Sequence, residues 1–329
     1  YQESAGVTGR QTSRQATRQR TRKPSSQRGQ VRGRLGNRNR KRNRRHGPIN
    51  ALKRSWRKAN WPTCIKMVLI PTVAVVVVVA LVAGLVRFTN WRAQVRAAEA
   101  AQLELTRTYD FNPGNIISDG QFFNGSAMSQ AEVQSFLDTQ GGSLAAMTFD
   151  TSNESGEGLC TDYTGTKGES AAAIIDQSAR ACKVSQKVLL TVMQKEQHLV
   201  TAVDPSDYQL MAAMGLNCPD TADCDPTYAG FFRQVYGAAK RYRYYLEHEE
   251  QYGYTAHNLN YIQYHPNAAC GGAQVYIENK ATALLYIYTP YQPNIAALAA
   301  GNGTGDSCSS YGNRNFALIY TSWFGSPRS

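Results

Sequence analysis

One acidic residue lies at the centre of an apolar helical face. The stretch SQKVLLTVMQKEQHLVT, from Ser185 to Thr201, has apolar residues at helical spacing. At about 100° per residue, Glu196 projects between Val192 and Met193 on that face. A carboxylate is costly to bury, so in such a place it is either paired or used in chemistry. Apolar surroundings raise the pKa of a glutamic acid, as a general acid for a glycosidic oxygen requires.

Glu196 could instead have a purely structural role. It could be buried and paired with Arg180 or Arg233, or it could simply reach water at the end of its helix. A second carboxylate would indicate hydrolysis by two acids, but the acids that follow lie in turns rich in Pro and Ser: Asp204, Asp207, Asp220, Asp223 and Asp225. The His residues show no metal-ligand spacing, so we expect no metal and no cofactor.

The residues around Glu196 resemble the lytic transglycosylase and lysozyme-like superfamily. The similarity lies in residues 170–201, in MAAMGL from Met211 and in CPDTA from Cys218. It implies a lysozyme-like fold in which Glu196 is the catalytic acid and later the base on the peptidoglycan sugar chain. It also implies a single carboxylate, with the sugar's own 6-hydroxyl as the attacking group. Gln197 stands where these enzymes usually carry Ser, and we expect it to contact substrate.

Most of residues 111–329 is also similar to exported actinobacterial proteins labelled haemagglutinin-like. The shared motifs are PNAACG from Pro266, VYIEN from Val275, YTPYQPN from Tyr288 and GTGDSCSSYGNRNF from Gly303. This resemblance implies an exported surface protein. Three interpretations stay open: a peptidoglycan lytic transglycosylase or glycoside hydrolase, a non-catalytic glycan-binding or adhesion domain, and a structural partner of envelope machinery.

Tyrosines in the C-terminal part of the chain could contact a glycan, because their rings offer flat apolar faces and their hydroxyls form hydrogen bonds. We expect Tyr261, Tyr264 and Tyr288 to do so. Asn279, on a helix predicted over residues 274–287, would add a polar contact. Packing of that helix is the alternative role for its side chains.

A run of uncharged residues from Met67 to Val86 is long enough to cross a bilayer core. Trp61 and Trp91 lie where aromatic side chains favour the membrane interface. A buried core element is the first alternative, but the run is long for one. A cleaved signal peptide is the second, but 66 residues precede the run. We therefore expect a retained transmembrane helix in a lipid bilayer.

The positive charge of the chain lies before this run. Residues 1–66 hold 20 of the 36 Lys and Arg but only Glu3 among the 24 acids, which leaves 16 bases and 23 acids beyond. Positive residues favour the inner side, so we expect a cytoplasmic N-terminus and an extracellular C-terminal domain at the cell membrane. The tail has few large apolar side chains, which predicts disorder. Residues 10–58 are expected to contact anionic inner-leaflet lipids rather than nucleic acid.

Six of the seven cysteines follow the run, and Cys64 precedes it. An even set on the outer side predicts disulfide bonds in an oxidising compartment. The sequence leaves the pairing open. The simplest arrangement joins neighbours along the chain, which would pair Cys160 with Cys182, Cys218 with Cys224, and Cys270 with Cys308.

These features predict a mainly α protein in four parts: a disordered basic cytoplasmic tail (1–66), a transmembrane helix (67–86), a juxtamembrane helical stalk (87–110) and an extracellular lysozyme-like domain (111–329). Ser129 and Glu132 form a capping box that predicts a helix to about residue 139. Further helices are predicted over 169–182, 185–201, 228–252 and 274–287, with two shorter ones after Pro293 and Asn313. The only weak strand candidate is 261–264.

Overall fold

The computed structural model describes residue 53, residues 60–218 and residues 224–329. Most of the basic segment 10–58 lies outside the described residues, and so do Asp220 and Asp223, so what was expected of them stays a prediction. The chain divides into two units, residues 1–74 and residues 75–329. The described helices and strands of residues 111–329 all belong to the second unit.

One long helix, α2 (Trp61–Tyr109), contains both the predicted membrane span and the predicted stalk. No helix boundary separates the two at residue 87, because the Ala, Glu, Gln and Leu residues that follow the apolar run are also good helix formers. Large apolar side chains between Val68 and Phe88 are exposed rather than packed in a core. By length and composition this helix could cross a membrane.

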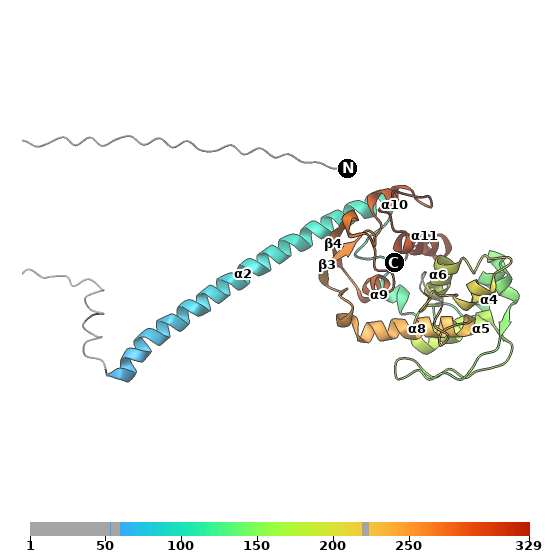
Figure 1. The fold of residues 1–329 in the computed structure, drawn as a ribbon, viewed down its shortest axis with the longest axis horizontal. Helices are drawn as coiled ribbons and strands as arrows, with labels where there is room; N and C mark the ends of the chain where they lie inside the picture. The colour runs from blue at the N-terminus through green and yellow to red at the C-terminus, as the bar shows by residue number, and fades with distance from the viewer. Residues whose placement is uncertain (1–52, 54–59, 219–223) are drawn as a thin grey trace, which may run out of the picture. The chain divides into compact units, whose positions relative to one another are not determined.

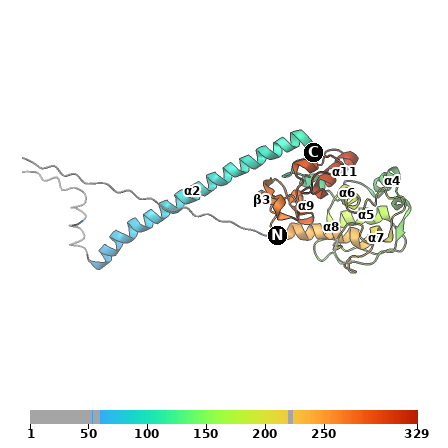
Figure 2. The same cartoon turned by 45° about the horizontal axis from the view of Figure 1, so that its top comes forward.

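The helices after α2 form the bulk of the second unit, which is mainly helical as predicted (Figure 1). Both views show α4, α5, α6 and α8 gathered together, with β3 and α9 lying beside each other away from α4 (Figure 2). Helix α5 packs against α4, α6 and α8, and α11 packs against α6. The helix bounds are α3 Asp119–Phe122, α4 Gln130–Gln140, α5 Ala171–Cys182, α6 Gln186–Gln197, α7 Asp207–Met211, α8 Phe231–Glu247, α9 Lys280–Tyr288, α10 Ile295–Ala299 and α11 Gly312–Phe324.

Helix α4 begins where its capping box predicts. The Ser129 side chain accepts a hydrogen bond from the backbone N–H of Glu132, and the Glu132 carboxylate accepts one from the backbone N–H of Ser129. Gly141 ends the helix in the left-handed conformation. Val133 and Leu137 are the buried side chains of this helix.

Two short antiparallel hairpins complete the fold. In the first, β1 (Thr148–Phe149) pairs with β2 (Glu169–Ser170). In the second, β3 (Asn258–Gln263) pairs with β4 (Gly272–Ile277), and Asn258 faces Ile277 across the ladder. Single 3-10 turns occupy Ser143–Ala146, Glu249–Gln251 and Ala268–Cys270.

The helix predicted over residues 274–287 is wrong in its first part. Gln274 to Ile277 belong to β4, and the helix α9 starts only at Lys280. Val275 and Ile277 are buried while Gln274 is exposed, which is the alternation of a strand that packs on one face. Asn279 is therefore not inside a helix. Its side chain caps α9 by accepting a hydrogen bond from the Thr282 N–H at 2.8 Å.

Two other helices are shorter than predicted. Helix α6 ends at Gln197 instead of residue 201, because His198 takes a left-handed backbone with φ of 53°. The Gln194 side chain then bonds the returning chain at Thr201, with Nε2 to Oγ1 at 2.9 Å. Helix α8 covers residues 231–247 of the predicted 228–252. The weak strand candidate at 261–264 lies within and just after β3.

The structure contains the three disulfide bonds expected from neighbours in sequence. Cys160 to Cys182 ties the long loop after β1 to the end of α5, and Cys218 to Cys224 closes a small loop before α8. Cys270 to Cys308 joins the β3–β4 turn to the segment before α11. The three bridges thus cross-link loops and turns, which constrains the unfolded chain.

Candidate active site

Helix α6 places Glu196 in its last turn. The residues before it on the same helix, among them Leu189, Val192 and Met193, are fully buried, as the apolar periodicity predicts. The side chain of Glu196 keeps 27% of its surface exposed. The carboxylate therefore lies at the edge of the core and stays accessible from solvent.

The cation that contacts Glu196 is its neighbour Lys195, which forms an ion pair with the carboxylate. The Lys195 side chain is only 6% exposed. Its Nζ also donates to Thr289 Oγ1 at 3.1 Å and lies 5.6 Å from the centre of the Tyr288 ring. The Glu196 carboxylate is therefore held by an ammonium that is itself fixed by a second contact.

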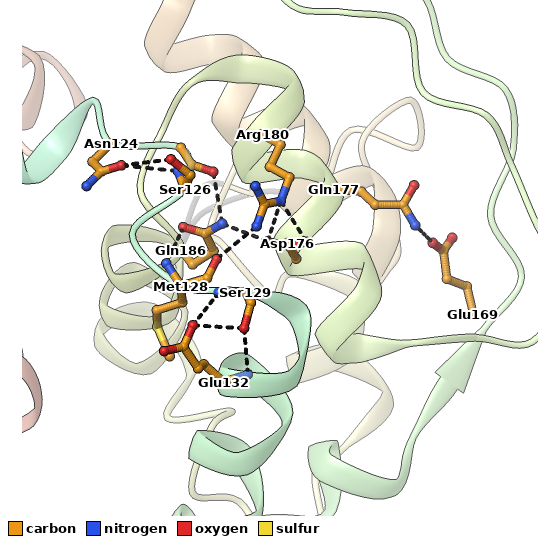
Figure 3. A network of polar contacts seen from close by, with 11 residues as sticks. Asn124, Ser126, Met128, Ser129, Glu132, Glu169, Asp176, Gln177, Arg180 and Gln186 are labelled. Carbon is orange, nitrogen blue, oxygen red and sulfur yellow. Dashed lines mark hydrogen bonds and ion pairs between the residues drawn. The ribbon is translucent and has the colours of Figure 1, made fainter.

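The arginines proposed as alternative partners are engaged elsewhere, so the buried Glu–Arg pair is wrong. Arg180 on α5 binds Asp176, with Nε within 2.9 Å of both carboxylate oxygens. Gln186 at the start of α6 donates to the same carboxylate at 2.7 Å, and Figure 3 shows both side chains turned toward it. Arg233 lies 3.8 Å from Glu154.

A glycine approaches Glu196 from the segment between α7 and α8. Gly215 has φ of +69°, and a Cβ built on it would lie 3.3 Å from both Cγ and Cδ of Glu196. Its two neighbours are held by Gln234 of α8, whose Oε1 accepts from Met214 N at 3.1 Å and from Leu216 N at 3.0 Å. The backbone beside the carboxylate is thus fixed, and its left-handed conformation and the closeness of Glu196 both favour glycine there.

Two tyrosines form the deeper wall of the site. Tyr242 on α8 and Tyr288 at the end of α9 stack with ring centres 5.1 Å apart. Burial holds the pKa of both phenols well above the ordinary value of tyrosine, and the charge of Glu196 raises each further. The Tyr288 hydroxyl donates to Met214 O, whereas the Tyr242 hydroxyl has no hydrogen-bond partner among the described residues. The site therefore combines one accessible carboxylate with two un-ionised phenols.

Of the residues expected to contact substrate, Tyr288 lies close enough to Glu196 for the charge of Glu196 to affect its pKa. Gln197 follows it on α6, and its carbonyl accepts from Gln209 Nε2 at 2.7 Å. Tyr261 is 56% exposed on β3, in the second hairpin.

Tyr264 and Asn279, which were also expected to contact substrate, make contacts within the fold. Tyr264 lines a largely apolar cavity of about 300 Å³ together with Ala98 of α2 and Val275 of β4. Asn279 caps α9 and donates to Asn115 Oδ1 at 2.8 Å. These positions do not test a role in substrate binding, which stays a prediction for all five residues.

Three residues of the site were not predicted from the sequence: Lys195, Gly215 and Tyr242. Gly215 could have been found from the sequence, since it is the glycine of the motif MAAMGL that resembles lytic transglycosylases. No pattern in the sequence pointed to Lys195 or Tyr242. Lys195 contacts Glu196 and Tyr242 contacts Tyr288, and both contacts depend on how α6, α8 and α9 pack.

Comparison with known proteins gives one result. Residues 115–329 match the family model described as LasA, N-terminal domain. No curated protein and no solved structure matches the chain. The matched segment contains Glu196, the three disulfide bonds and every residue of the site described above.

Proposed function

The chain belongs to the family of the LasA N-terminal domain, and from this premise we propose that it is an exported, membrane-anchored protein that cleaves the glycan strands of peptidoglycan. In this proposal Glu196 is the general acid and base, as in a lytic transglycosylase or muramidase. The domain 111–329 has a lysozyme-like role outside the cell, and the basic tail 1–66 stays inside.

The position of Glu196 is the observation that supports the proposal most. It is a carboxylate at the edge of a buried helix, accessible from solvent, beside a backbone that carries no side chain at Gly215. A sugar chain would have to reach it through the exposed part of its side chain. Burial keeps Tyr242 and Tyr288 protonated at neutral pH, so neither ring adds a second negative charge beside Glu196.

The proposed reaction needs a single carboxyl group. In the first step the protonated Glu196 donates its proton to the glycosidic oxygen, and the bond from that oxygen to the anomeric carbon breaks. In the second step the Glu196 carboxylate accepts the proton of the attacking hydroxyl. If that hydroxyl is the 6-hydroxyl of the same sugar, the product is an anhydro sugar and no second acid is needed.

The membrane anchor is supported by α2. Its apolar side chains are exposed along the segment predicted to span, which is what lipid contact requires. The three disulfide bonds favour an oxidising compartment for the domain that follows. Together with the charge of residues 1–66, these features favour a cytoplasmic N-terminus.

A second candidate function is a glycan-binding domain without catalysis. It is favoured by the ion pair between Lys195 and Glu196, because the pair engages the carboxylate that would have to act on the glycosidic oxygen. Under the enzymatic proposal, this ion pair opens when substrate binds.

Incubation with purified peptidoglycan separates the two functions. The full chain in detergent micelles is mixed with sacculi, and released fragments are identified by mass spectrometry. General acid catalysis is worth about 10² to 10⁴ in rate, so Glu196→Gln should lower release by that order while the protein still sediments with the polymer. Glu247→Gln, an exposed glutamate on α8, is the matched control and should release as much as the unchanged chain. If the unchanged chain sediments with sacculi but releases nothing, the enzymatic proposal is wrong and the binding function stands.

A further inference from the structure

A cavity lies beside α8, close to the segment that contacts Glu196. It has a volume of about 340 Å³ and is lined on α8 by Gly237, Lys240, Arg241 and Tyr244. Glu157, Leu159, Tyr228 and Tyr252 complete its lining. The volume is at the lower end for small-molecule sites.

Arg241 is the unusual residue of this cavity. It is half-buried, and among the described residues no carboxylate lies within ion-pair distance of its guanidinium. Its Nη2 donates to the Tyr228 hydroxyl at 3.3 Å, and the guanidinium lies 5.6 Å from the centre of the Tyr228 ring. Asp225 is near enough for Arg241 to contribute to its lowered pKa, but its oxygens accept from Thr227 and Asn217.

The other cation of the cavity is already neutralised. Lys240 Nζ lies 3.4 Å from the Glu157 carboxylate and donates to Ser155 O at 3.2 Å. Among the described residues that line the cavity, Arg241 is therefore the cation without a carboxylate partner. Arg241 also contacts Tyr245. A guanidinium at the wall of a cavity has five donors and suits a carboxylate in two-point geometry.

The aromatic rings of the cavity are held in place before any ligand arrives. Tyr244 stacks on His248 with ring centres 4.1 Å apart, and Tyr252 packs edge to face against Tyr245 at 4.8 Å. Tyr228 is fixed by the contact with Arg241. Pre-organised aromatic rings offer flat faces to a pyranose ring, and their hydroxyls offer hydrogen bonds to its substituents.

A short connection joins the cavity to the Glu196 site. Gly215 contacts Glu196, and the next residue, Leu216, reaches Gly237 in the cavity lining, where a Cβ would lie 2.9 Å from Leu216 Cδ2. The segment 215–216 thus lies against both Glu196 and the cavity lining.

We propose that the cavity around Arg241 is a subsite for a carboxylate-bearing sugar of the same glycan strand, with Arg241 binding the carboxylate and the tyrosines contacting the ring. This inference rests on the proposed function for the identity of the polymer. It adds a chemical preference, because Arg241 would select a glycan strand by the carboxylate on one of its sugars.

Two soluble probes of equal length test the subsite. The first is the disaccharide of N-acetylglucosamine and N-acetylmuramic acid, whose lactyl group carries a carboxylate, and the second is the neutral disaccharide of N-acetylglucosamine. Calorimetric titration of the full chain in detergent should show tighter binding of the acidic probe. A hydrogen-bonded charge is worth about 1.5–3 kcal/mol, so Arg241→Gln should weaken the acidic probe by about 10- to 100-fold and leave the neutral one unchanged.

Arg243→Gln is the matched control, since Arg243 lies on the same helix outside the cavity lining and should leave both affinities as they are. Equal affinity of the unchanged chain for the two probes overturns the subsite, as does an Arg241→Gln variant that binds the acidic probe normally. Both results leave cleavage by Glu196 intact. Conversely, a chain that prefers the acidic probe through Arg241 but releases no fragments from sacculi keeps the subsite and removes the enzymatic function.

Discussion

The side-chain amide of Gln102 binds both backbone groups of Tyr276. Its Oε1 accepts from the Tyr276 N–H at 2.8 Å, and its Nε2 donates to the Tyr276 carbonyl at 3.2 Å. Gln102 is only 3% exposed, and it belongs to α2, whereas Tyr276 belongs to β4. The end of the long helix therefore pairs with a strand of the second hairpin as a neighbouring strand would.

Replacing Gln102 by Ala should lower the free energy of unfolding of this unit by about 1–3 kcal/mol, because the Tyr276 N–H and carbonyl lose their partners. Denaturant unfolding of the full chain in detergent, followed by near-ultraviolet circular dichroism, measures the change. Gln94→Ala on the exposed side of α2 is the control and should stay within about 0.5 kcal/mol of the unchanged chain. Equal stabilities for the two variants would mean that the helix end is not docked by Gln102.

The parts of the fold that follow from local signals could be predicted from the sequence. The helix α4 begins at its capping box, and α5 ends within a residue of the predicted position, since caps and apolar periodicity act over a few residues. Strand β4 could not, because its conformation depends on pairing with β3 across a turn. The strand's own residues, QVYI, carry no turn or breaker that would separate them from the helix that follows.

The candidate site, too, could be predicted from the sequence only in part. Glu196 could be found because its place among Val192 and Met193 is set by one helix. The role of Lys195 could not, since neighbouring residues on a helix point in different directions. Its side chain also contacts Thr289 and Tyr288, which lie far along the chain, so its place depends on tertiary packing.

Alkaline pH should destabilise the protein through its buried tyrosines. Burial raises the pKa of Tyr320 to about 12, and burial together with nearby acids raises that of Tyr236 to about 12, while the unfolded chain titrates near 10. The folded state then holds these protons more tightly than the unfolded state does. The contribution of these two tyrosines to stability should be complete below pH 10, fall between pH 10 and 12, and be lost above that range.

Single substitutions show which tyrosines cause the fall in unfolding free energy at alkaline pH. At about 1.4 kcal/mol per pKa unit, each tyrosine accounts for at most about 2–3 kcal/mol over the window. Tyr320→Phe, which removes one titrating group, should reduce the slope of unfolding free energy against pH, whereas Tyr261→Phe, at an exposed position, should not. Denaturant unfolding at several alkaline pH values, with tyrosinate absorbance as a second signal, measures both. A slope that Tyr320→Phe leaves unchanged contradicts this origin.

Gly215 offers a test of the Glu196 site that leaves the catalytic side chain itself in place. Gly215 and Gly253 both have left-handed backbones, with φ of +69° and +73°, so replacement by Ala should strain each by about 1–2 kcal/mol. Only at Gly215 does the new Cβ meet another group, namely Glu196 Cγ and Cδ at 3.3 Å, whereas at Gly253 it meets nothing within 4 Å. The two variants should therefore lose similar stability but differ in what happens to the carboxylate.

A displaced carboxylate is the reason to expect a difference in activity. Misplacing a catalytic group by about 1 Å can cost about 10²-fold in rate, and a shift of a few tenths of an ångström at Glu196 should cost about tenfold in fragment release from sacculi. Gly253→Ala should release fragments at nearly the rate of the unchanged chain, measured at a temperature where both variants are folded by circular dichroism. If the two variants lose activity equally, the loss comes from backbone strain alone, and the contact between Gly215 and Glu196 has no part in the function.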